Sequence, residues 1–255
     1  MTTAPLAPML LHQTRTEFLK LWRTPAFSAT SLALPVMFFA FFGLPAVGRS
    51  IGGVDAGAYL LGSFAAYAVL NVMLFSFGIT VAVERAQNQD ALMRASPLSP
   101  AVYLTARVLT ALVFALLTLV ALFLFAALVG GVRLTAATWL ELTGRLLLGS
   151  LPFIALGFTI GFTSDARAAP GVINLIYLPM ALASGLFVPI NQLPGLVQLI
   201  APLLPVYRYA QLAWGALGAA TEPLGTTLLW LAAWTVVLFG LAIRAYGRVE
   251  AEKFS

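Results

Sequence analysis

Few side chains in this sequence could do chemistry, and those few lie outside the long apolar runs. The only lysines are Lys20 and Lys253, and neither follows a glycine, so the chain lacks the GxxxxGKS/T loop that binds phosphate in P-loop ATPases. The only histidine, His12, lies in the polar N-terminal segment, which excludes a Ser-His site or a histidine-ligated metal site within the apolar runs. Four carboxylates stand near the ends of those runs, at Asp55, Glu141, Asp165 and Glu222. The sequence therefore predicts no catalytic residues, no metal site and no cofactor in this chain.

The longest charged interruption is the stretch 84–107, which separates uncharged runs at 56–83 and 108–132. Its charged residues are Glu84, Arg85, Asp90, Arg94 and Arg107. Residues 84–95 are good helix formers, with a small apolar face at Ala91, Leu92 and Ala95, and Pro97 ends that helix. Ser99 and Pro100 suit the N-cap and first position of the next helix. We expect a short helix that receives a force from a partner in water; the alternative is a solvated connector.

Composition places the chain in a membrane. Hydrophobic residues make up 61% of its 255 residues and charged residues only 9%, whereas soluble domains carry about 25% charged residues. Too few charged side chains are available to cover a water-facing surface. The net charge of +5 is therefore interpreted as a marker of membrane side rather than of nucleic-acid binding.

Uncharged runs of about 20 residues, the length needed to cross a bilayer, define the predicted spans. The uncharged stretch 168–207 is too long for one crossing, and prolines crowd its second half. We therefore divide it into a span and a re-entrant segment, 193–205, on the far side. The prediction is a single all-α domain over 1–255 with six spans, at 25–47, 57–83, 106–130, 146–164, 168–188 and 223–244.

Lysine and arginine placement gives the orientation. With six spans, ten of the 14 basic residues fall on the side that holds both termini and the stretch 84–107. Basic residues favour the cytoplasmic side, so we expect cytoplasmic termini and a location in the bacterial plasma membrane. Residues 10–22 place Leu11, Phe18 and Trp22 at helical spacing, which predicts an amphipathic helix in the headgroup layer or an ordinary polar lead-in.

The sequence resembles the permease subunits of type-2 ABC exporters in two places. Residues 84–109, beginning with Glu-Arg and ending in RASPLSPAVYLTARVL, are similar to the coupling region of that family. Residues 184–214, SGLFVPINQLPGLVQLIAPLLPVYRYAQLAW, are similar to the segment that joins its fifth and sixth spans. Asn88-Gln89 is a departure, because many relatives carry Gly-Thr there. The span pattern matches over essentially the whole chain.

The resemblance implies that 10–23 is an interfacial elbow helix and that 88–97 is a coupling helix seated in a nucleotide-binding ATPase subunit. It implies a dimer of two permeases, identical or different, on two ATPases that hold ATP and magnesium. The residues expected to couple to the ATPase are Glu84, Arg85, Asn88, Gln89, Asp90, Leu92, Arg94, Ser96 and Pro97. The residues expected in the external re-entrant segment are Gly185, Pro189, Leu193, Pro194, Pro202, Pro205 and Tyr207.

Polar residues inside the spans are candidates for the transport pathway, because such residues tend to face a cavity or a helix partner. The candidates are Tyr67, Asn71, Asn174, Tyr177 and Ser184. Plain helix packing or dimer contact is the alternative for them. The spacing Gly157-x-x-x-Gly161 is one further candidate for close helix packing.

The predicted function is export of an amphiphilic substrate, such as a drug, lipid or glycan-like molecule, driven by a separate ATPase. One alternative is a non-transporting membrane scaffold or assembly protein with the same spans. Another is a secondary transporter, although ionisable residues are missing at the depth where ion-driven carriers use them.

Overall fold

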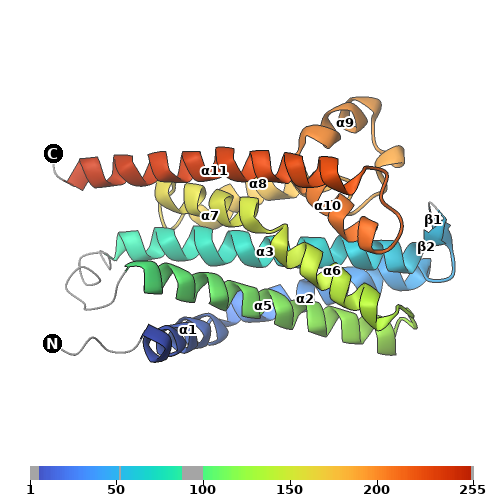
Figure 1. Cartoon of the computed structure of the whole chain (residues 1–255), viewed down its shortest axis with the longest axis horizontal. Helices are drawn as coiled ribbons and strands as arrows, with labels where there is room; N and C mark the ends of the chain where they lie inside the picture. Colours follow the sequence, from blue (N-terminus) through green and yellow to red (C-terminus); the bar gives the residue numbers. More distant parts are fainter. Residues whose placement is uncertain (1–5, 52, 88–99, 254–255) are drawn as a thin grey trace.

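The computed structural model describes residues 6–51, 53–87 and 100–253. Its long helices α3 (Ala56–Ala86), α5 (Pro100–Leu128) and α11 (Leu224–Lys253) all run along the longest axis (Figure 1). Helix α1 (Leu6–Trp22), the end of α3, the start of α5 and the end of α11 gather at one end of this bundle. That arrangement leaves both ends of the described chain on the same side.

The opposite end of the bundle carries the short elements. Strands β1 (Ser50–Ile51) and β2 (Val54–Asp55) pair antiparallel, with Ser50 opposite Asp55, and they lead into α3. The carboxylate of Asp55 accepts hydrogen bonds from the backbone N–H groups of Gly48 (2.7 Å) and Ala58 (2.9 Å). Asp55 therefore acts as the N-cap that fixes where α3 begins.

Among the described residues, five helical segments are long and apolar enough to cross a membrane, at 25–46, 56–86, 101–128, 136–163 and 224–249. The first comprises α2 (Pro25–Phe38), a π-helical turn η1 (Phe39–Gly43) and the 3-10 turn η2 (Leu44–Ala46). The predicted span 168–188 forms α8 (Ala169–Ala183), whose 15 residues cover about 22 Å, less than the roughly 30 Å of hydrocarbon. The structure therefore supports an all-α membrane protein with five such segments and one shorter apolar helix.

The fourth segment begins earlier than the sequence predicted. Helix α6 (Ala136–Leu148) and α7 (Leu151–Thr163) follow each other with only Gly149 and Ser150 between them. The prediction started this span at 146 because Glu141 and Arg145 are charged. These two side chains form an ion pair one turn apart on α6, so neither charge stands alone.

Helix α3 forms the centre of the bundle, since most of its length is buried. It packs against α7 at glycines: a Cβ on Gly157 would lie 2.9 Å from the Cβ of Phe77, and one on Gly161 would lie 2.7 Å from the Cβ of Val81. Contacts this short leave no room for a side chain. The close-packing interpretation of Gly157-x-x-x-Gly161 is thus confirmed.

The segment after α8 forms η3 (Ile190–Gln192), α9 (Gly195–Ile200), η4 (Ala201–Leu203) and α10 (Pro205–Ala216). Helix α9 projects at the edge of the bundle (Figure 1), and its Leu196 and Leu199 are exposed. Helix α10, which the span analysis did not anticipate, is almost wholly buried. The short helix expected within 193–205 is thus followed directly by a longer buried one.

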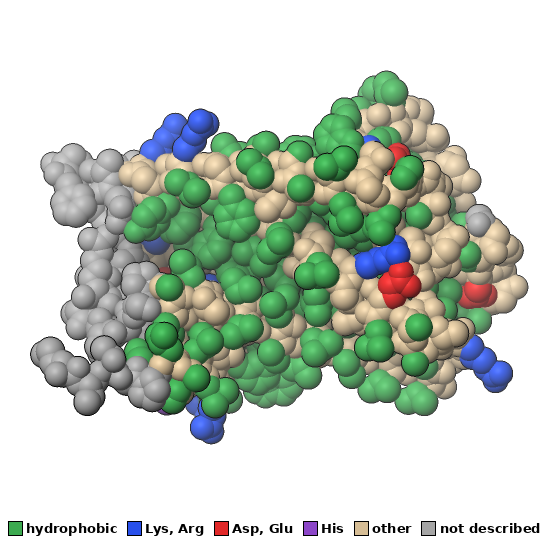
Figure 2. Space-filling view, in the orientation of Figure 1, with side chains coloured by type: hydrophobic (Ala, Val, Ile, Leu, Met, Phe, Trp, Pro, Cys, Tyr) green, Lys and Arg blue, Asp and Glu red, His purple; other side chains and the backbone are tan. Residues whose placement is uncertain are grey.

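The outer surface of the bundle is apolar. Figure 2 shows hydrophobic side chains across the middle of one face, with most charged side chains toward the two ends. Many large side chains on the outer helices are exposed, among them Leu128, Leu148, Leu175, Leu229 and Val236. A surface of this kind is suited to lipid rather than to water.

Candidate functional site

The ends of α3 and α5 that flank residues 88–99 are joined by buried charges. Oε1 of Glu84 accepts hydrogen bonds from Nη2 of Arg107 (2.6 Å) and Nζ of Lys20 (2.9 Å), and its Oε2 accepts one from Oη of Tyr103 (2.6 Å). We call Glu84, Lys20, Tyr103 and Arg107 the Glu84 cluster. It connects three elements, because Lys20 belongs to α1, Glu84 to α3, and Tyr103 and Arg107 to α5.

Burial determines how much each ion pair of Glu84 contributes to stability. Glu84 is 7% exposed and Arg107 is 3% exposed, whereas the Lys20 side chain is 43% exposed. A buried ion pair is costly to break, because the remaining charge is left without a partner, while an exposed pair contributes little. Arg107 also lies with its guanidinium 5.0 Å from the centre of the Tyr103 ring. The Glu84–Arg107 pair is therefore the firm part of the cluster.

The next residue along α3 attaches a fourth helix. Nη1 of Arg85 donates to the backbone carbonyl of Gly161 at 2.9 Å and lies 3.5 Å from that of Ser164. These carbonyls lie at the C-terminal end of α7, where a cation is favoured by the helix dipole. Glu84 and Arg85 thus tie the end of α3 to α1, α5 and α7.

Helix α1 is held against α5 by aromatic rings and by a hydrogen bond. The rings of Phe18 and Phe114 lie 4.9 Å apart, and Trp22 stacks on Phe18 at 5.9 Å. Oγ1 of Thr110 donates to the backbone carbonyl of Thr14 at 3.2 Å. The amphipathic helix predicted at 10–22 is therefore present within α1, and its place in the headgroup layer stays a prediction.

Most of the predicted coupling residues lie outside the described residues, so their roles stay predictions: these are Asn88, Gln89, Asp90, Leu92, Arg94, Ser96 and Pro97. Glu84 and Arg85 are described and lie directly before them. Sequence reasoning missed Lys20 and Tyr103 as partners. One signal was available, since a charge placed at the end of an apolar helix needs a partner when that end is buried.

The other end of the bundle holds a second buried cation, Arg208 on α10. Its Nε donates to the carbonyl of Pro202 at 2.7 Å, and its Nη1 lies 2.9 Å from Oε2 of Glu222, close enough for an ion pair although not aligned as a hydrogen bond. The side-chain amide of Gln211 donates to Oγ1 of Thr221 and accepts a hydrogen bond from the backbone N–H of Thr221. These contacts attach α10 to the segment that precedes α11.

The predicted re-entrant residues lie on both sides of α9. Gly185 adopts a φ of +82°, a backbone conformation that favours glycine, and it begins the turn after α8. Pro194 precedes α9, and Pro205 and Tyr207 lie in the buried helix α10. Pro189 precedes η3, Leu193 follows it, and Pro202 lies in η4.

The predicted pathway residues do not share one surface. Tyr67 and Tyr177 are buried with ring centres 5.4 Å apart, and Nδ2 of Asn71 lies 3.5 Å from Oη of Tyr177. Ser184 is fully buried, and its hydroxyl has no hydrogen-bond partner within the described chain. Asn174 is exposed and donates to the carbonyl of Pro170. A pathway role stays a prediction, and within one chain three of these residues form contacts between α3 and α8.

Across residues 6–51, 53–87 and 100–253, His, Asp and Glu side chains form no group of three that could hold a metal ion. The carboxylate of Glu84 accepts hydrogen bonds from three donors on the protein itself and is 7% exposed, so it is largely committed to contacts within the bundle. The arrangement is suited to holding helices together rather than to bond chemistry.

Comparison with known proteins gives two findings. The family described as "ABC-2 type transporter" matches residues 10–216. The chain is 30% identical over 207 residues to a Bacillus subtilis (strain 168) protein named "Putative transport permease YvfS", and the alignment covers 81% of this chain and 84% of that protein. The family match begins within α1 and ends at the last residue of α10, so it includes the Glu84 cluster and Arg208, although Glu222 lies beyond it.

Proposed function

Because this chain belongs to the ABC-2 type transporter family, we propose that it is the permease subunit of an ATP-driven exporter whose ATPase is a separate chain. The chain is a multi-pass membrane protein of that family. Its sequence lacks a phosphate-binding loop, which supports ATP hydrolysis, with its magnesium, on a partner. The export direction rests on the resemblance to type-2 ABC exporters.

One observation carries the proposal for coupling, namely the Glu84 cluster. Residues 88–99 connect an end of α3 to the start of α5, and that end of α3 is tied to α1, α5 and α7 by Glu84 and Arg85. A force that an ATPase applies to residues 88–97 would reach α5 through the buried Glu84–Arg107 ion pair, α7 through the hydrogen bonds of Arg85, and α1 through Lys20. The helices would then tilt together.

The proposed topology has six crossings and cytoplasmic termini. Helix α8 would complete the fifth crossing together with the residues that follow it, and α9 would lie on the external side. Helix α1 would lie in the headgroup layer, which agrees with its exposed Leu11 and its Trp22. A second permease, identical or different, and two ATPases would complete the transporter, with an amphiphilic substrate between the permeases.

The test is co-purification with a candidate ATPase from the same cell, comparing the wild type with a Leu92→Asp/Arg94→Glu variant. The matched control is Arg133→Glu, which changes one exposed arginine at the opposite end of the bundle. We expect the wild type and the control to bring down an ATP-hydrolysing partner and the loop variant to lose it while still inserting in the membrane. The proposal is contradicted if the loop variant still brings down the ATPase, or if the Arg133→Glu control loses it as well.

A further inference from the structure

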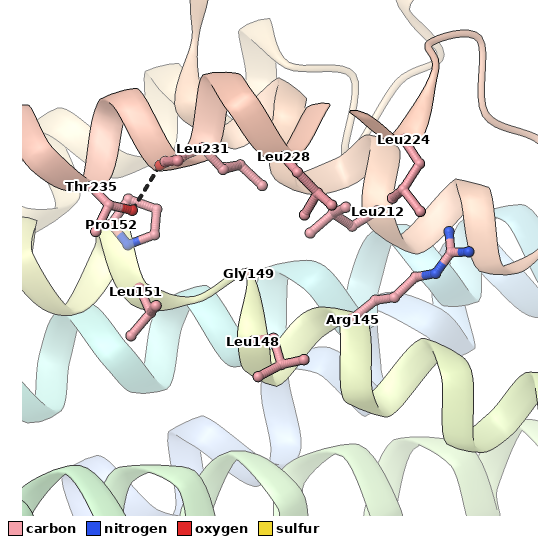
Figure 3. A pocket seen from close by; sticks show the side chains of 11 residues that line it. Arg145, Leu148, Gly149, Leu151, Pro152, Leu212, Leu224, Leu228, Leu231 and Thr235 are labelled. Atoms are coloured by element: carbon pink, nitrogen blue, oxygen red, sulfur yellow. Dashed lines mark hydrogen bonds between the residues drawn. The ribbon is translucent and has the colours of Figure 1, made fainter. Parts of the chain in front are cut away.

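A groove of about 330 Å³ opens at the junction of α6 and α7. Its walls come from that junction, from Leu212 of α10 and from one side of α11 (Figure 3). Gly149 caps α6, and α7 begins at Leu151 with Pro152, which has no backbone N–H, as its second residue. A Cβ on Gly149 would lie 2.5 Å from Cδ1 of Leu212, so the α6–α7 junction and α10 touch there.

The walls of the groove are apolar. Leucines face the groove from α11, and the hydroxyl of Thr235 donates its hydrogen to the backbone carbonyl of Leu231 at 2.7 Å (Figure 3). A bound water needs two to four polar partners, and apart from Arg145 the lining side chains are almost all apolar. The groove is therefore suited to hydrocarbon.

The groove is also open to the bilayer. The segments 136–163 and 224–249 that form two of its walls are both candidate membrane spans. Leu148 is 78% exposed, and Leu151 and Leu228 are each 49% exposed along its rim. In a membrane this rim contacts acyl chains, so a lipid can enter from the side.

A pair of opposite charges lies beside this apolar groove. Arg145 lines it, extends toward Leu212 and Leu224 (Figure 3), and forms an ion pair with Glu141. Figure 2 shows an adjacent basic and acidic side chain over α6, within the otherwise apolar face. The side chains of Glu141 and Arg145 are 47% and 24% exposed, so both can be reached from outside the chain. Charges on a lipid-facing surface are costly unless a polar group covers them.

We propose that the groove binds one acyl chain of a zwitterionic phospholipid that carries a primary ammonium headgroup. The phosphate lies at Arg145, where guanidinium groups bind phosphate strongly, and the ammonium lies at Glu141. A purely anionic headgroup would bring its charge against Glu141, and a choline headgroup has no N–H to donate to that carboxylate. The proposal needs the membrane placement of the chain and not its coupling to an ATPase.

The test is native mass spectrometry of the purified full chain after incubation with phosphatidylethanolamine, phosphatidylcholine or phosphatidylglycerol of the same acyl composition. One charge-assisted hydrogen bond predicts that phosphatidylethanolamine is retained roughly tenfold better than the other two. Glu141→Gln should remove the preference over phosphatidylcholine, whereas Arg145→Gln should lower retention of all three lipids. Asp165→Asn, which removes an exposed carboxylate that does not line the groove, should change neither the preference for phosphatidylethanolamine nor the retention of the three lipids.

Two tryptophan variants locate the acyl chain. Leu228→Trp places a bulky aromatic ring in the groove and should lower retention of every lipid. Its control, Leu229→Trp, changes a residue that is 73% exposed and does not line the groove, and should leave retention unchanged. Circular dichroism checks that both variants fold. Equal retention of the three lipids by the wild type, a preference for phosphatidylglycerol, or equal effects of the two tryptophans would overturn the proposal.

Discussion

Replacing Glu84 by glutamine should destabilise the chain more than any change at its exposed partner Lys20. The substitution removes the carboxylate that forms the ion pair with Arg107, which is 3% exposed. A buried ion pair that loses one partner costs about 3–5 kcal/mol, whereas an exposed pair contributes about 0–1 kcal/mol. For a chain of this size, 3 kcal/mol corresponds to a fall in Tm of roughly 6–12 °C.

The assay is thermal unfolding in lipid nanodiscs, followed by tryptophan fluorescence, for Glu84→Gln, Lys20→Ala and Glu84→Gln/Arg107→Met. The double variant should recover much of the lost stability, because Arg107→Met removes the buried charge that Glu84→Gln leaves without a partner. Lys20→Ala should lower Tm by only a few degrees. If Glu84→Gln and Lys20→Ala lower Tm equally, or if the double variant is less stable than Glu84→Gln, the reasoning is refuted.

Two further predictions concern packing and the opposite end of the bundle. Gly161→Leu should separate α3 from α7 and lower Tm by several degrees in the same assay, because even a Cβ would lie 2.7 Å from Val81 and 2.9 Å from the Gly78 carbonyl. Its control, Gly171→Ala, has open space around the new methyl group and should raise stability by about 0.5–1 kcal/mol; a loss at Gly171 equal to that at Gly161 would contradict the packing argument. Glu222→Gln should expose the segment before α11 to limited proteolysis, because it leaves Arg208 buried without its carboxylate partner. An unchanged cleavage pattern would show that this ion pair does not hold the segment.

The sequence predicted the membrane class and most of the bundle because long uncharged runs have few alternatives in a bilayer. Pro100 at the first position of α5 and the close packing at Gly157 and Gly161 were also predicted correctly. These features depend on local residue types, so a single sequence carries them.

Two kinds of pairing were missed. Helix α6 was not expected because Glu141 and Arg145 were each counted as a lone charge, although their i,i+4 spacing pairs them on a helix. Pairing between distant residues was missed as well. Glu84 meets Lys20, 64 residues away, through the packing of α1 on α5, which no periodicity encodes. Helix α10 was missed because the prolines around 194–205 were interpreted as the end of helical structure, whereas Pro205 begins a helix.

The central claim is that residues 88–97 seat in a separate ATPase, and a site-specific cross-link tests it most directly. The chain has no cysteine, so Leu92→Cys creates a single thiol for a benzophenone maleimide in the purified complex. Irradiation should give an adduct of this chain with the ATPase from Leu92→Cys and none from Arg133→Cys at the opposite end. No adduct from Leu92→Cys, or an equal yield from both positions, would contradict the account.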